Sequence, residues 1–102
     1  MTPMGDSAFD ALLATERAAY AGRVELRVAD IEAHLAAGRV DDARRAAHKL
    51  SGSAGTYGFP ALSSAAREIE ETLERGGRVD DSMLGRLREA NADAKKSTEP
   101  RP

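Results

Sequence analysis

His48 is the residue of this chain best suited to chemistry, and the residues that follow it are small. On a helix, the positions three and four residues further on share the face of the first residue. Here they are Ser51 and Gly52, and Gly55 lies one further turn along. Glycine inside a helix costs about 1 kcal/mol relative to alanine, so two glycines need a reason. We interpret them, together with Ser51, as residues that keep the approach to the imidazole open.

Three cations lie close to His48 in the sequence. Arg44 and Arg45 precede it by four and three residues, and Lys49 follows it directly. Neutral imidazole is a nucleophile, and a phosphoryl group in transfer carries negative charge that nearby cations stabilise. The combination is compatible with a histidine that accepts a phosphoryl group. The spacing alone also fits a surface histidine among ordinary helix-surface charges, so both interpretations stay open at this point.

The remaining polar candidates have simpler interpretations. His34 lies near the end of a predicted helix, where a cation is favoured, and it forms no Glu-x-x-His pattern that would predict a metal site with His48. Tyr57 and Phe59 are expected to close one end of the fold or to offer apolar contact to a partner. Four glutamates are interpreted as a solvated helix face rather than a catalytic carboxylate pair: Glu68, Glu70, Glu71 and Glu74.

Composition limits the class of protein. A chain of 102 residues with 41% apolar and 31% charged residues fits one globular domain. Its net charge of −2 provides no basic field for nucleic acid, and it contains no cysteine. No apolar run approaches the roughly 20 residues of a membrane span, and the first six residues do not resemble a signal peptide. We therefore expect a cytoplasmic protein that binds neither nucleic acid nor membrane.

Helical spacing of the apolar residues predicts four helices, over about residues 7–37, 40–55, 60–75 and 80–95. Ser7 is expected to cap the first helix, Pro60 suits the first turn of the third, and Asp80 or Asp81 suits the start of the fourth. Gly22 interrupts the first apolar pattern and leaves open a short extra N-terminal helix. Short connections between amphipathic helices make them antiparallel neighbours. The expected fold is an all-α, up-down-up-down four-helix bundle over residues 7–95, with a flexible N-terminus over 1–6 and a disordered tail over 96–102.

The run from His48 to Gly55, His-Lys-Leu-Ser-Gly-Ser-Ala-Gly, resembles the histidine phosphotransfer (HPt) domain family. Further matches follow at Gly58, Leu62 and Ala66, and at the pair Ile69-Glu70. The match is specific near the histidine and diffuse elsewhere. The resemblance implies a four-helix bundle with a phosphorylatable histidine on its second helix, and it assigns that role to His48. It also implies a partner, the receiver domain of a response regulator or of a hybrid histidine kinase.

The family commonly has a lysine three residues after the histidine, where this chain has Ser51. Lys49 or the two arginines are expected to compensate. The resemblance implies a phosphocarrier that shuttles phosphoryl groups between receiver aspartates, while the receiver supplies the Mg²⁺. The glycines at 52, 55 and 58 do not form a dinucleotide or phosphate-loop fingerprint, so we expect no autonomous kinase activity and no cofactor or metal of its own.

Two other functions are compatible with the same residues. The first is a docking module that keeps the fold and binds a receiver or kinase domain without being phosphorylated. The second is a small enzyme that uses His48 as a general base, for which the sequence offers no second catalytic group at helical spacing from His48. We expect the chain to be a monomer in either case.

Overall fold

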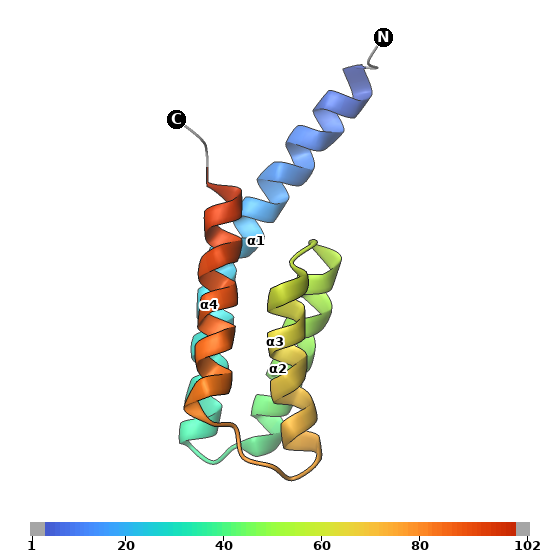
Figure 1. The fold of residues 1–102 in the computed structure, drawn as a ribbon. Coiled ribbons are helices and arrows are strands. Elements are labelled where there is room, and N and C mark those ends of the chain that lie inside the picture. The colour runs from blue at the N-terminus through green and yellow to red at the C-terminus, as the bar shows by residue number, and fades with distance from the viewer. Residues whose placement is uncertain (1–3, 100–102) are drawn as a thin grey trace.

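The computed structural model describes residues 4–99. The exposure of side chains is described for residues 8–99. It contains four helices: α1 (Met4–Ala36), α2 (Val40–Thr56), α3 (Pro60–Glu74) and α4 (Asp81–Thr98). α1 packs on α2 and α4, and α3 packs on the same two helices. The helices therefore form a closed ring in chain order, with α1 and α3 at opposite corners (Figure 1). The predicted all-α four-helix bundle is confirmed.

α1 is much longer than its neighbours. Its N-terminal part, blue in Figure 1, extends past the turn between α2 and α3 and leaves the bundle. The first buried side chain of α1 is Tyr20, whereas residues 8–16 are all exposed. About half of α1 therefore builds the core, and the other half projects beyond it.

The apolar faces of the four helices meet in one core. The pattern of buried residues along α2, every third or fourth position, is that of an amphipathic helix. α3 contributes a similar face. The largest fully buried side chains come from all four helices: Val24, Ile31, Leu50, Leu62, Ile69 and Leu87.

Specific residues begin and end the helices. Gly38 has a positive φ of 74°, a conformation that glycine adopts without strain, and Arg39 N–H donates to the His34 carbonyl at 2.8 Å to close the end of α1. Pro60 occupies the first turn of α3. The Asp80 carboxylate accepts a hydrogen bond from Met83 N–H at 2.9 Å and caps α4. The predictions for Pro60 and Asp80 are confirmed.

Three aromatic rings close the end of the bundle at the α2–α3 turn. Tyr20 stacks on Tyr57, with ring centroids 4.4 Å apart, and lies 5.9 Å from Phe59. Arg17 covers the Phe59 ring at 4.6 Å, and its Nε donates to the Tyr57 carbonyl at 2.9 Å. The interpretation of Tyr57 and Phe59 as the residues that close this end is confirmed.

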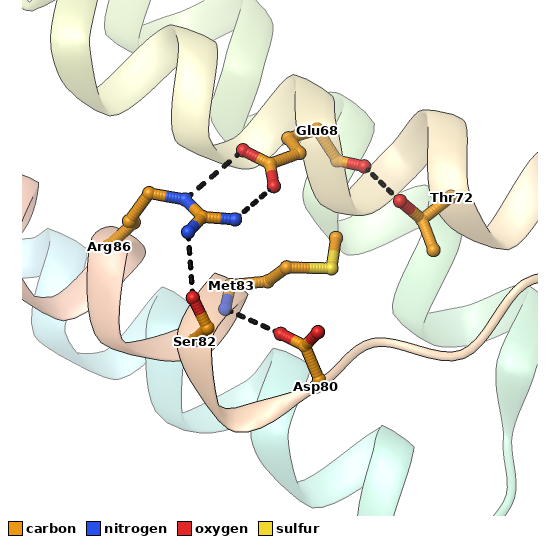
Figure 2. A network of polar contacts seen from close by, with 6 residues as sticks. All are labelled: Glu68, Thr72, Asp80, Ser82, Met83 and Arg86. Atoms are coloured by element: carbon orange, nitrogen blue, oxygen red, sulfur yellow. Dashed lines mark hydrogen bonds and ion pairs between the residues drawn. The ribbon is translucent and has the colours of Figure 1, made fainter.

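Polar contacts tie α3 to α4 (Figure 2). The Arg86 guanidinium pairs with both oxygens of Glu68 and also donates to Ser82 Oγ at 2.7 Å. The Thr72 hydroxyl bonds the backbone carbonyl of Glu68 at 2.8 Å. Since Arg86 and Glu68 are both about half exposed, this pair contributes modestly to stability.

Three expectations about the chain ends and α1 were wrong. α1 runs without a break through Gly22, because burial of Tyr20, Ala21 and Val24 around it outweighs the roughly 1 kcal/mol cost of one glycine. There is thus no separate N-terminal helix. α1 begins at Met4, so Ser7 is not its cap and residues 4–6 are helical. α4 reaches Thr98, so residues 96–98 are helical too. The expectations for residues 1–3 and 100–102 lie outside the described part of the chain.

Candidate functional site

His48 stands on the outer surface of α2. The buried residues of α2 include Ala47 and Leu50, and this face turns position 48 away from the core. The His48 side chain is 70% exposed. The imidazole is therefore open to solvent, as the sequence predicted, and another protein can reach it.

The Glu70 carboxylate of α3 holds one nitrogen of this ring. The distance from His48 Nδ1 to Glu70 Oε2 is 2.6 Å, and the Glu70 side chain is only 13% exposed. Glu70 is positioned by its neighbour Ile69, which is fully buried in the core. An ionised carboxylate can only accept hydrogen bonds, so the proton of the neutral imidazole lies on Nδ1. In this tautomer the other nitrogen, Nε2, keeps its lone pair.

Sequence reasoning missed Glu70. We interpreted it as part of a solvated face with three other glutamates, and that interpretation is wrong for Glu70. Glu68 is about half exposed and pairs with Arg86. Only Glu71 and Glu74 are exposed. Two features of the sequence pointed to Glu70. The first is the match of Ile69-Glu70 to the family pattern. The second is spacing, because His48 lies ten residues before Gly58 in the turn and Glu70 lies twelve residues after it. In an antiparallel helix pair such positions face each other.

The pairing also bears on the enzyme alternative. The sequence offered no second catalytic group at helical spacing from His48. The second group comes from the neighbouring helix instead, at hydrogen-bond distance.

The small residues around His48 have different positions. Gly52 and Gly55 are exposed, and a Cβ added at Gly52 would meet no described atom within 4 Å beyond its own helix turn. Ser51 is buried at 5% exposure, and its backbone carbonyl accepts a hydrogen bond from Ser63 Oγ at 2.8 Å. The expectation that Ser51 lines the approach to the imidazole was therefore wrong, because its short side chain turns into the α2–α3 contact.

The cations predicted to assist His48 surround it unevenly. Arg45 and Lys49 are exposed and line a cavity of about 330 Å³ between α1 and α2, and Arg45 lies 3.9 Å from Asp42. Arg44 is half-buried on the same helix. His34 lines the same cavity and accepts a hydrogen bond from Arg39 Nε at 3.1 Å. The site thus combines a carboxylate on its α3 side with positive charge along α2.

Two further observations concern residues 4–99. Within this range, no group of three or more histidine, aspartate or glutamate side chains is arranged to hold a metal ion. None of the helices in it has both the length and the apolar character needed to cross a membrane.

Comparison with known proteins gives one match. The family model of the Hpt domain matches residues 17–96, which covers α2, α3, most of α4 and the part of α1 that enters the bundle. No curated protein and no solved structure gives a significant match. Hpt domains carry phosphoryl groups on histidine in phosphorelay signalling, and they work with receiver domains and histidine kinases. On this match and on its four-helix architecture, the chain belongs to the Hpt domain family.

Proposed function

We propose that His48 is the phosphoryl-accepting residue of this chain, and that it reacts through Nε2. It receives the phosphoryl group from an aspartyl phosphate on a receiver domain and passes it to the aspartate of another. The observation that carries the proposal is the hydrogen bond between His48 Nδ1 and Glu70, because it leaves Nε2 unprotonated on a side chain that is 70% exposed.

The transfer needs no proton to be removed. The Nε2 lone pair attacks phosphorus, the N–P bond forms, and the P–O bond to the aspartate breaks, so that its electrons return to the aspartate as a carboxylate. The Nδ1 proton stays in place, so the phosphorylated ring carries a positive charge. The Glu70 carboxylate lies 2.6 Å from Nδ1 and stabilises that charge. Return of the phosphoryl group to a second aspartate follows the same steps in reverse.

The surroundings of His48 support a site that is completed by residues of a partner protein. Exposed Gly52 leaves room for a partner surface, whereas a Cβ at Gly55 would lie 3.6 Å from Ser63 Oγ of α3. Arg44, Arg45 and Lys49 lie on the same helix as His48, and their positive charge would attract an acidic receiver site. In this proposal the acidic residues and the Mg²⁺ belong to the receiver, and the chain is a phosphocarrier without kinase activity of its own. Its cytoplasmic location stays a prediction.

A general-base enzyme is the alternative that the histidine–glutamate pair favours, since a carboxylate that orients an imidazole is common in catalysis. The exposure of His48 argues against it. Enzyme sites are concave and exclude water, whereas this ring projects from a helix surface. His48 is not among the residues that line the cavity between α1 and α2.

The test is incubation of the chain with a panel of receiver domains phosphorylated with radiolabelled phosphate. We expect acid-labile, base-stable label on the wild-type chain and none on His48→Gln. The variant should fold normally because the side chain is exposed. If both proteins bind a receiver equally and neither takes up label, the chain is a docking module and the proposal is wrong.

A further inference from the structure

The outer face of α1 carries an apolar pattern that the bundle does not use. Along α1, a series of positions separated alternately by four and three residues holds only small or apolar residues. The series extends over almost four heptads. We call these residues the α1 seam: Ala8, Leu12, Thr15, Ala19, Gly22, Leu26, Ala29 and Ala33. All eight are exposed. The residues of α1 that enter the core, such as Val24 and Ile31, lie on the opposite side of the helix.

This spacing is the sequence signature of a coiled coil. A lone surface helix has no need of it, because its outer face is normally polar. The two leucines are among the most exposed apolar residues of the described chain, at 57% for Leu12 and 71% for Leu26. The seam is about 39 Å long at 1.5 Å per residue, long enough for a stable pair of helices.

Gly22 provides an independent observation. It lies in the middle of a continuous helix, where glycine costs about 1 kcal/mol. An added Cβ there would meet no other described atom within 4 Å, and its φ is not positive. Nothing in the fold of the single chain requires glycine at this position. A glycine here would allow a second helix to cross closely at this point.

We propose that the α1 seam binds a second copy of this chain, and that the two α1 helices pair antiparallel. With Ala19 opposite Gly22 of the second copy, the smallest residues meet at the two-fold axis. Leu26 then packs on Thr15 of the second copy, and Leu12 packs on Ala29. Each large side chain thus meets a small one, which is the arrangement that fills a helix interface.

Charges beside the seam select this direction. In the antiparallel register above, Glu16 of one copy faces Arg23 of the other, and symmetry makes this attractive pair twice. Parallel pairing would bring Glu25 of one copy beside Asp30 of the other, again twice, with repulsion. The dimer replaces the monomer expected from the sequence. It leaves His48 free, since Glu70 and its helix lie at the corner of the bundle opposite α1.

Sedimentation velocity over a range of concentrations tests the proposal. We expect the wild-type chain to pass from a 10.8 kDa monomer to a dimer of twice that mass. Leu26→Glu should raise the dissociation constant at least about 100-fold, because it removes two buried leucines per dimer. Val40→Glu is the matched control, since Val40 is also exposed (49%) but lies on α2. A wild-type chain that stays monomeric, or equal effects of the two variants, would overturn the proposal.

Cysteine cross-linking tests the direction of pairing, because the chain has no cysteine of its own. Ala19→Cys and Gly22→Cys chains are mixed and oxidised. Antiparallel pairing predicts that the mixed disulfide forms in preference to either symmetric one. Predominant symmetric disulfides would show parallel pairing and contradict the proposed register. Exchanging the charges in Glu16→Arg/Arg23→Glu should restore the dimer that each single change weakens.

Discussion

At the residue scale, the Glu70 carboxylate decides which nitrogen of His48 carries the proton. Glu70→Gln removes its negative charge and allows an amide to donate to Nδ1, which favours the wrong tautomer. A hydrogen bond to a charged group contributes about 1.5–3 kcal/mol, so we expect phosphoryl acceptance to slow by about 10- to 100-fold. The rate of label uptake from a phosphorylated receiver measures this effect.

The matched control for that change is Glu71→Gln, which alters the adjacent, exposed residue of α3. It should leave the rate unchanged. Nitrogen-15 NMR of the imidazole gives a second readout, because it distinguishes the protonated nitrogen from the bare one. A wild-type ring with its proton on Nε2 would contradict the assignment.

Clearance beside the ring is a separate property of the site. Gly52 lies one helical turn after His48, and its side-chain position is open. Gly52→Gln should therefore keep the fold and slow phosphoryl transfer by obstructing the partner. Gly85→Gln is the matched control, because Gly85 is also exposed, helical and open, but lies on α4. Equal transfer rates for the two variants would show that clearance at Gly52 has no role.

Tyr20 makes the stability of the fold depend on pH. Its hydroxyl lies 2.6 Å from Ser53 Oγ, and burial raises the pKa of Tyr20 above its ordinary value, more than the Ser53 hydrogen bond lowers it. A raised pKa in the folded state gives stability that is fully present below the ordinary tyrosine pKa of about 10 and is lost as pH rises through the folded value.

We therefore expect the free energy of unfolding to fall above about pH 10, and to fall less steeply in Tyr20→Phe. At neutral pH the same variant should lose about 1 kcal/mol with its hydrogen bond. Urea unfolding at neutral and alkaline pH measures both effects. Identical slopes for the two proteins would mean that another group causes the alkaline loss.

At the scale of single elements, the start of α4 depends on one side chain. Asp80→Ala removes the acceptor for Met83 N–H and should lower the free energy of unfolding by about 1 kcal/mol. Asp80→Asn keeps a capping oxygen and should cost much less. Urea unfolding of the two variants compares them, and an equal loss would indicate that the charge of Asp80 matters more than its cap.

Elements were predictable from the sequence where the signal is local. The apolar spacing indicated all four helices, and Pro60 and Asp80 marked two of their starts, because these residues act within one turn. The break at Gly22 that the sequence left open does not occur, since a single glycine cannot outweigh burial on both sides of it. The start at Met4 had no local signal, since Gly5, Asp6 and Ser7 are poor helix formers.

The same distinction between local and long-range signals applies to the candidate site. The exposure of His48 followed from its position beside the apolar stripe of α2. The contact with Glu70 did not, because the two residues are 22 positions apart in the chain on different helices, and their contact depends on how α2 and α3 are aligned. The burial of Ser51 depends on the same alignment, through its contact with Ser63.

At the scale of the whole molecule, the proposed dimer keeps its two reactive histidines apart. α1 occupies the dimer interface, and the His48–Glu70 pair lies between α2 and α3. Each copy should therefore accept one phosphoryl group independently. We expect Leu26→Glu to abolish the dimer without changing the transfer rate per chain, measured with a phosphorylated receiver above and below the dissociation constant. A slower rate for the monomeric variant would show that pairing supports the site.

The uncovered Nε2 of His48 has a consequence for how a signal travels. Acceptance and donation would use the same atom with the same neighbours, so whatever eases one step eases its reverse to the same degree. The chain then cannot set the direction of phosphoryl transfer. Net flow is decided elsewhere, by the relative free energies of the two aspartyl phosphates and by how quickly the terminal one is consumed. Dephosphorylation of the final acceptor favours forward transfer. Accumulation of its phosphorylated form favours return of the phosphoryl group towards its source.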